Sequence, residues 1–520
     1  MIPWQPRLKA LASLFLARPR ISAFLLGAAA TLGLPPLYIF PAFLAAVPLL
    51  LWLLNEAPTS RQRFIRGWWF GFGYFLCSLY WISIAFTIEP ETYGWLIPFS
   101  LIGLPALLAF YPAAAAYFAF RWPMPPLQRL IMFSLFWVLA ELLQGVLFTG
   151  FPWNALGYML GFADGLAQGA ALAGLYGLSL LAILLAASLA VFLPPFRYSK
   201  AWRFPMIMLM AAGALQIWGT ARLPAAKPAA EGAPLIRLVQ PHIAQRMKWH
   251  PDEWPQHLQK LLILSQIQNL PGKNPDLIIW PETAVPFALM ENKEVRQSIA
   301  NAVPPGAFLV TGTLRLIRDE TGKVESLRNS LVALDHQGAA VAVYDKFHLV
   351  PWGEYVPGRK LFGGLPFLAG SIDFSPGPGP AAMQLDNLPP FSPLICYEVI
   401  FPGKVTPIQK VRWLLNITND AWYGHTAGPY QHLASSRFRS IETGLPLIRV
   451  ANTGISAVID AHGRVRESMA LGMTGFIDAA LPPALKPPLY ARFGNTILAT
   501  IMLLLALSAK WSGRDKKKAA

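Results

Sequence analysis

The sequence Y-D-K-F-H-L-V-P-W-G-E at 344–354 begins at the end of an apolar run that is typical of a buried strand. Two further segments have the same form, W-P-E at 280–282 and L-I-C-Y-E at 394–398. A base, a cation and a sulfur nucleophile are the minimum set for acyl transfer through a thioester. In order along the chain, the segments supply a carboxylate, an ammonium and a thiol: Glu282, Lys346 and Cys396.

The composition of the chain is that of a membrane protein. Of its 520 residues, 54% are hydrophobic and 13% are charged, and the mean hydropathy is +0.42. Soluble proteins typically have about 25% charged residues. The net charge is +16, but Arg and Lys gather in short loops and at the C-terminus, where they orient a membrane protein. We therefore expect no nucleic-acid partner, and the length predicts two or more domains.

A bilayer span needs about 20 mainly apolar residues. The apolar runs predict about eight transmembrane helices, seven before residue 223 and one near the C-terminus. Their approximate ranges are 11–34, 36–54, 67–87, 94–120, 130–148, 165–193, 204–221 and 493–511.

The loops between these spans carry the orientation signal. Arginine and lysine follow the second, fourth, sixth and eighth predicted spans, whereas the other loops carry acids and almost no base. Because positive residues stay on the cytoplasmic side, we expect both termini in the cytoplasm. The predicted domains are a membrane domain at 1–222, an extracytoplasmic domain at 223–490, and a C-terminal helix with a basic tail at 491–520.

The segment 223–490 alternates short β-rich runs with helical patterns, which indicates an α/β layered domain with buried strands. Apolar residues at helical spacing predict a helix at 252–270, and further helices are expected at 293–303 and 430–443. The expected strands are 235–239, 277–280, 308–311, 330–334, 341–344, 394–397, 413–418, 448–451 and 457–459.

Each candidate residue taken alone also has a structural explanation. Cys396 could be a small core residue, Glu282 a turn-capping acid, and Lys346 a solvated residue at a strand end. Two observations favour reactivity. The apolar strand becomes polar abruptly at Cys396, and Glu282 follows a strand end, where open α/β sheets tend to build their sites. The histidines show no H-E-x-x-H spacing and the two cysteines cannot form a thiolate zinc site, so we expect neither metal nor cofactor.

As a set, the three segments resemble the nitrilase superfamily of carbon–nitrogen hydrolases, which uses a Glu-Lys-Cys triad in this chain order. The run N-I-T-N-D-A-W-Y-G at 416–424 is similar to the strand and loop that follow the nucleophile in that superfamily. The resemblance implies an α-β-β-α sandwich. It also implies that Cys396 is the nucleophile, Glu282 the general base and Lys346 the cation that stabilises the oxyanion.

The flanking sequence narrows this resemblance. Seven predicted spans before the domain and one after it, with G-F-P-W at 150–153 and M-K-W at 247–249, look like the apolipoprotein N-acyltransferase family of bacterial inner membranes. The likeness implies that a phospholipid acylates the thiol. The thioester would then pass the acyl chain to the N-terminal α-amine of a diacylglyceryl apolipoprotein. It also implies a multi-pass protein of the inner membrane with a periplasmic catalytic domain.

The same likeness implies supporting residues around the triad. Glu354 is expected to orient the lysine, while Tyr397 and Glu398 shape the cleft. We also expect mobile apolar loops at 362–367 and 149–165 to dip into the outer leaflet of the bilayer. Substrate contacts are expected from three aromatic residues: Trp249, Phe151 and Trp153.

Several other interpretations stay open at this point. A membrane-tethered nitrilase-like amidase would use the same triad to hydrolyse a C–N bond, and a transporter with an extracytoplasmic binding domain would not need the thiol. A Cys–His dyad could use His348 in place of the acid. Glu141, inside the fifth predicted span, is either functional or hydrogen-bonded to a neighbouring helix. The preferred phospholipid and the oligomeric state stay undetermined.

Overall fold

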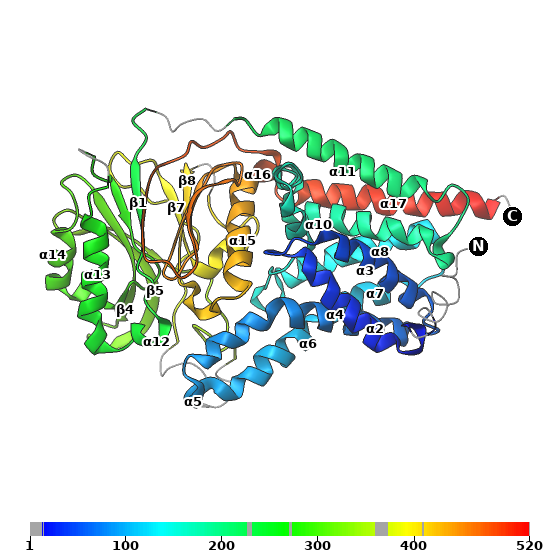
Figure 1. The fold of residues 1–520 in the computed structure, drawn as a ribbon, viewed down its shortest axis with the longest axis horizontal. Coiled ribbons are helices and arrows are strands. Elements are labelled where there is room, and N and C mark those ends of the chain that lie inside the picture. The colour runs from blue at the N-terminus through cyan, green and yellow to red at the C-terminus, as the bar shows by residue number, and fades with distance from the viewer. Residues whose placement is uncertain are drawn as a thin grey trace. The chain divides into compact units, whose positions relative to one another are not determined.

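The computed structural model describes Ser13 and residues 15–225, 231–269, 273–358, 373–407 and 410–518. Contacts divide the chain into two compact units, which Figure 1 shows as ribbons. The helical unit comprises Met1–Ser83, Leu96–Leu223 and Phe493–Ala520, and the sheet unit comprises Ile84–Trp95 and Pro224–Arg492. The segment Ile84–Trp95, which we predicted within the membrane domain, therefore groups with the sheet unit.

The helical unit is built from apolar helices that short 3₁₀ turns connect. Two glycines bring the backbones of its helices α2 and α4 into contact. A Cβ atom at Gly27 would lie 1.9 Å from the carbonyl oxygen of Phe70, and one at Gly73 would lie 2.1 Å from that of Phe24. Small residues at such contacts are typical of membrane helices. The helices are α2 (Pro19–Ala30), α3 (Phe40–Asn55), α4 (Ser60–Leu79), α6 (Leu104–Leu108), α7 (Phe110–Ala119), α8 (Pro126–Gln144), α9 (Asp164–Ala167), α10 (Ala170–Ser188), α11 (Arg203–Arg222) and α17 (Thr496–Lys518).

Helices of membrane-spanning length occur in the described part of the chain. Phe40–Asn55 and Thr496–Ala509 are apolar but shorter, and the predicted span at 11–34 overlaps α2, which has 12 residues. These apolar helices support a membrane protein, while the total of eight spans stays a prediction. The five segments long and apolar enough to cross a membrane are Ser60–Thr87, Pro90–Ala119, Pro126–Gln144, Ala170–Phe192 and Arg203–Arg222.

The sheet unit contains two β-sheets. The first has the order β12-β1-β2-β4-β5-β6, with β3 also paired to β4, and the second has the order β11-β10-β9-β8-β7. The strands are β1 (Leu235–Gln240), β2 (Leu277–Ile279), β3 (Val285–Ala288), β4 (Phe308–Arg318), β5 (Val324–Asp335), β6 (Ala340–Asp345), β7 (Phe391–Ile395), β8 (Trp413–Thr418), β9 (Leu447–Ala451), β10 (Ser456–Ile459), β11 (Val465–Met469) and β12 (Gly475–Ala480). The helices are α5 (Pro90–Tyr93), α12 (Gln245–Lys248), α13 (Trp254–Gln266), α14 (Lys293–Ala300), α15 (Gly428–Thr443) and α16 (Leu489–Phe493).

Side chains along β1 point alternately to the two faces of the first sheet, and apolar residues on both faces explain why this sheet is covered on each side. Ile236 and Leu238 belong to a buried cluster that also contains Leu415 and Ile417 of β8, so this cluster lies between the two sheets. Val239 faces the other way and packs with residues of α13 and α14, which cover the outer face of the first sheet (Figure 1). Helix α15 packs against β9 of the second sheet. The predicted α-β-β-α sandwich is therefore confirmed.

Candidate active site

The loops that follow β2, β6 and β7 carry the three residues predicted to be catalytic. Lys346 comes directly after β6, and its Nζ atom lies 3.7 Å from Oε1 of Glu282, which follows β2. Both side chains are buried. Cys396 follows β7, and the charges of Glu282 and Lys346 both act on its thiol. The structure thus brings together an acid, an ammonium and a thiol that lie far apart in the sequence.

A second carboxylate, Glu354, holds the lysine. Lys346 donates from Nζ to Oε1 of Glu354 at 2.9 Å, and the main-chain N–H of Val350 donates to Oε2 of Glu354 at 2.8 Å. Asn329 of β5 donates from Nδ2 to Oε1 of Glu282 and to Oε1 of Glu354, each at 2.9 Å. Burial lowers the pKa of Lys346, but the charges of Glu354 and Glu282 outweigh it and raise the pKa overall. The lysine is therefore cationic at neutral pH.

Cys396 sits at a sharp turn. The strand ends at Ile395, so the predicted strand at 394–397 extends too far, and Cys396 has a φ of 51° in the left-handed region. Burial, followed by the charge of Glu282, raises the pKa of Cys396 to about 12, whereas Lys346 lowers it. A thiol with this pKa is protonated at rest, so its attack needs a base that removes the proton as the substrate reacts.

Glu398 ties the lysine loop to the cysteine turn. Its carboxylate accepts main-chain N–H bonds from Phe347 at 2.8 Å and His348 at 3.1 Å in the lysine loop. It also accepts the N–H of Ile395 at 2.7 Å, just before the cysteine, and the hydroxyl of Tyr344 at 3.0 Å. Glu398 therefore fixes the distance between the two loops that carry the ammonium and the thiol.

Tyr397 and His348 form an aromatic cluster. The ring centroid of His348 lies 3.7 Å from that of Phe401 and 5.7 Å from that of Tyr397. The Tyr397 ring packs edge to face on Phe401 at 5.1 Å. His348 thus packs on these two rings, and a different imidazole, that of His432, contacts the main chain of Cys396.

A buried network supports the main chain at Cys396. Nε2 of His432 lies 3.2 Å from the carbonyl oxygen of Cys396, while Nδ1 lies 3.0 Å from Oδ1 of Asp420 and 3.1 Å from a guanidinium nitrogen of Arg449. Burial and the charge of Arg449 lower the pKa of His432, so the imidazole is neutral at neutral pH. A carbonyl oxygen and a carboxylate oxygen both only accept, so the single N–H of the neutral ring donates to one of these two partners. The network holds the Cys396 carbonyl in place.

Sequence reasoning missed several residues that contact the triad. Thr418, the last residue of β8, and Tyr423 both form side-chain hydrogen bonds with Cys396. Lys248 of α12 is buried and donates from Nζ to the carbonyl oxygen of Glu282 at 3.0 Å. Their only signal in the sequence is their place within the motifs N-I-T-N-D-A-W-Y-G and M-K-W.

The residues predicted to contact substrate have different environments. Trp249, which follows α12, is 40% exposed. Trp153 of the helical unit is 3% exposed, and its ring packs against Trp81 at 4.8 Å and Phe151 at 6.0 Å. Their roles in substrate binding stay predictions. The predicted apolar loop at 362–367 lies outside the described residues.

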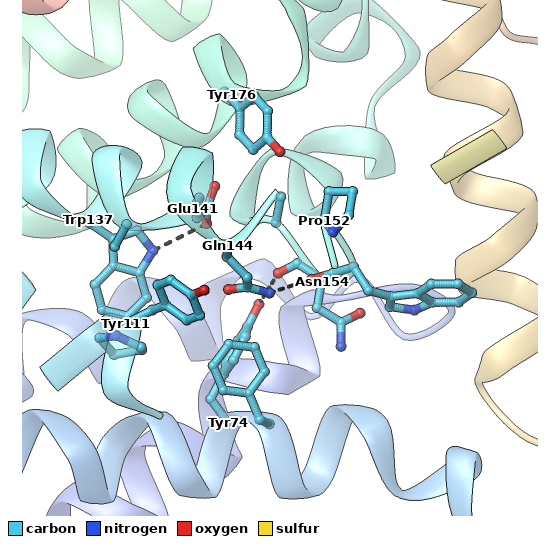
Figure 2. A pocket seen from close by; sticks show the side chains of 13 residues that line it. Tyr74, Tyr111, Trp137, Glu141, Gln144, Pro152, Asn154 and Tyr176 are labelled. Atoms are coloured by element: carbon cyan, nitrogen blue, oxygen red, sulfur yellow. Dashed lines mark hydrogen bonds between the residues drawn. The ribbon is translucent and has the colours of Figure 1, made fainter. Parts of the chain in front are cut away.

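Figure 2 shows a pocket within the helical unit that is lined by both aromatic and polar side chains, among them Glu141. Oε1 of Glu141 accepts the indole N–H of Trp137 at 3.2 Å and the main-chain N–H of Leu156 at 2.9 Å. Gln144 donates from Nε2 to the carbonyl oxygen of Phe151 at 2.9 Å. These bonds anchor the loop that we expected to be mobile, and they support the structural interpretation of Glu141.

Comparison with known proteins first identifies the class of domain to which the sheet unit belongs. The carbon–nitrogen hydrolase family model matches residues 235–485, so the sheet unit is a nitrilase-like domain. An amidase from Nesterenkonia sp. AN1 is 19% identical with a TM-score of 0.37, covering 52% of this chain and 98% of that chain. A carbon–nitrogen hydrolase from Helicobacter pylori G27 is 16% identical with a TM-score of 0.35, covering 48% of this chain and 88% of that chain.

The rest of the chain narrows this class to one family. Residues 26–188 match the apolipoprotein N-acyltransferase N-terminal domain. Apolipoprotein N-acyltransferase from Rhodopseudomonas palustris is 36% identical over 94% of this chain and 95% of the relative. The one from Bradyrhizobium diazoefficiens is 38% identical over 93% of both. The chain belongs to the apolipoprotein N-acyltransferase family, and it is an acyltransferase.

Proposed function

We propose that this enzyme transfers an acyl chain from a membrane phospholipid, through a thioester on Cys396, to the N-terminal α-amine of a diacylglyceryl-cysteine apolipoprotein. One observation carries the mechanism: Lys346 is bonded to Glu354 at 2.9 Å and lies 3.7 Å from Glu282, beside a buried thiol. This arrangement supplies a fixed cation for an oxyanion and a separate carboxylate for proton transfer. The family of the chain supports the lipoprotein acceptor.

In the first half-reaction, Glu282 removes the proton of the Cys396 thiol as the sulfur attacks the carbonyl carbon of the phospholipid acyl ester. Lys346 stabilises the oxyanion that forms, and one such donor is typically worth about 10²–10³ in rate. When the ester C–O bond breaks, Glu282 returns the proton to the glycerol oxygen. A lysophospholipid leaves, and the acyl chain stays on the sulfur as a thioester.

In the second half-reaction, the free α-amine of the apolipoprotein attacks the thioester carbonyl. Glu282 accepts the proton that the amine nitrogen loses, and Lys346 again stabilises the oxyanion. The C–S bond then breaks, the proton passes to the sulfur, and an amide forms. The thiol of Cys396 is regenerated, and the lipoprotein leaves in its triacylated form.

The proposal includes a location in the bacterial inner membrane. We infer about eight spans, both termini in the cytoplasm and the sheet unit in the periplasm. The apolar helices and the family support membrane association, and the distribution of arginine and lysine supports the orientation. Removing an acyl chain from the bilayer costs about 0.8 kcal/mol per CH₂. A thiol that takes such chains therefore has to react at the membrane surface.

The test follows a labelled acyl chain. The full-length enzyme in vesicles receives phospholipid with a labelled acyl chain and a synthetic diacylglyceryl-cysteine peptide. The proposal predicts label on the peptide α-amine and none with Cys396→Ala. Label that appears only as free fatty acid would support a membrane-tethered hydrolase, an alternative that the relatives do not favour. Activity retained in Cys396→Ala would contradict the thioester.

A further inference from the structure

A second ammonium lies beside the general base. Lys248 ends α12, and the residue is only 2% exposed. Its Nζ atom donates to the main-chain carbonyl oxygen of Glu282 at 3.0 Å. Within the described residues, the ammonium bonds to this carbonyl and pairs directly with no carboxylate. Its positive charge therefore acts on the active site without being cancelled by an ion pair.

The titratable groups that face Lys248 are Glu282, Cys396 and His257. Burial lowers the pKa of Lys248 to about 8, while the charges of Glu282 and Cys396 oppose this shift. With this pKa the lysine is mostly protonated at neutral pH and loses its proton under mildly alkaline conditions. The site therefore contains, besides the permanent cation Lys346, a second cation that titrates just above neutral pH.

The loop that Lys248 holds is constrained from other directions as well. Thr283, next to the base, has a φ of 47°, and a Cβ atom at Gly312 would lie 2.4 Å from the Thr283 nitrogen. Asn329 holds the Glu282 carboxylate itself at 2.9 Å. Lys248 adds the contact to the main-chain carbonyl. A nearby positive charge also favours the ionised form of a buried carboxylate, which burial alone disfavours.

We propose that Lys248 is a positioning residue for acyl transfer: its ammonium, hydrogen-bonded to the Glu282 carbonyl, holds the Glu282 loop in place and supplies a positive charge beside the general base. The inference rests on the proposed role of Glu282. It assigns to the lysine of the M-K-W motif a role distinct from that expected of its neighbour Trp249.

The experiment measures how fast iodoacetamide alkylates Cys396 from about pH 5 to about pH 9. The full-length enzyme carries Cys77→Ala, because Cys77 is exposed and would also react. In Lys248→Met the midpoint of the fall in rate at acidic pH should rise by about one pH unit, with alkylation about tenfold slower below it, because the positive charge that favours an ionised carboxylate is lost. Lys248→Arg keeps a cation and should keep the original midpoint.

The shape of the pH profile shows whether Lys248 positions the base or only supports the structure. A uniform slowing at every pH, an unchanged profile, or failure of Lys248→Arg to restore the midpoint would overturn the proposal. Lys293→Met makes the same change on an exposed lysine of α14 and should leave the profile unchanged. Lys248→Gln gives the same comparison if the Met variant does not fold.

Glu282→Gln distinguishes this inference from the proposed function. In Glu282→Gln the fall in alkylation rate at acidic pH should disappear. If it does, and Lys248→Met leaves that fall at its original pH, only the role of Lys248 fails. If Glu282→Gln leaves the fall in rate at acidic pH unchanged, Glu282 is not the base, and the proposed mechanism itself is wrong. Alkylation needs no lipid, so neither result depends on the acyl donor.

Discussion

The Nζ atom of Lys346 lies 2.9 Å from Oε1 of Glu354, which comes eight positions later in the chain. This bond fits the separate roles that we propose for the two carboxylates of the site. Glu354 is occupied on both oxygens, by the lysine and by the N–H of Val350. Glu282 lies farther from the ammonium, at 3.7 Å, so it can take up and release a proton while the lysine stays paired.

Glu354→Gln should weaken this arrangement without changing the size of the side chain. The charge of Glu354 raises the pKa of Lys346, so its loss lowers that pKa and leaves the ammonium less firmly held. We expect acylation of the thiol by phospholipid to slow by about 10²-fold, the effect of one misplaced oxyanion donor. Single-turnover measurements with labelled phospholipid give this rate. Glu291→Gln breaks an exposed ion pair and should have little effect; an equal loss there would contradict the assignment.

Tyr423→Phe removes a hydrogen bond to the sulfur of Cys396. A hydrogen bond to the charged form favours that form, so its loss should disfavour the thiolate. We expect alkylation of Cys396 at neutral pH to slow about tenfold, as for the loss of one bond to a charged group. Tyr430→Phe makes the same change at an exposed tyrosine. Equal rates in the two variants would show that the Tyr423 hydroxyl does not act on the sulfur.

Gly312→Ala tests the placement of the base. The added Cβ atom would lie 2.4 Å from the Thr283 nitrogen and 2.7 Å from Cα of Glu282, and backbone atoms cannot yield cheaply. We expect a destabilisation of about 1–3 kcal/mol and a loss of transfer that exceeds what the lower stability explains. Thermal melting and transfer assays measure the two effects. Gly213→Ala, where the Cβ atom meets nothing within 4 Å, is the control. Full activity in Gly312→Ala would show that the base tolerates displacement.

Glu398 should make stability depend on pH. Burial raises its pKa from 4.5 to about 7, although main-chain bonds from Ile395, His348 and Phe347 oppose the shift. Between these values the folded protein holds a proton that the unfolded chain has lost, so this contribution to stability falls as the pH rises toward 7 and is constant above it.

Glu398→Gln removes this titration. The Tm of the wild type minus that of the variant should therefore decrease from about pH 5 to about pH 7 and then level off. Differential scanning fluorimetry in detergent measures both values. Glu294→Gln makes the same change at an exposed position of α14, away from the site, and is the control. A difference that grows with pH would contradict the raised pKa.

The sequence predicted the parts of the fold where polarity changes abruptly. Glu282, Lys346 and Cys396 each end or follow an apolar run, and their order along the chain matched a known triad. The three strands that we did not predict, β3, β11 and β12, lack this abrupt change from apolar to polar residues. Strand β3 contains Pro286, β11 is largely exposed, and β12 begins with a glycine and carries Asp478. The buried partner that makes Asp478 acceptable, Arg237, lies 241 positions away.

The residues that surround the triad could not be predicted for the same reason. Asn329 is one polar side chain within a long strand, and its bonds to Glu282 and Glu354 span loops that meet only in the folded domain. Lys248 is the last residue of a short helix, and nothing near it in sequence indicates that its ammonium is buried. Their roles depend on tertiary contacts, which a single sequence does not report.

The most direct test of the account is mass spectrometry of the peptide that contains Cys396, after the enzyme has been incubated with phospholipid and no acceptor. The account predicts an added acyl mass on this cysteine, which disappears when a diacylglyceryl-cysteine peptide is supplied and never forms in Glu282→Gln. Transfer to the peptide without any acyl mass on Cys396, or an acyl mass on another residue, would contradict it.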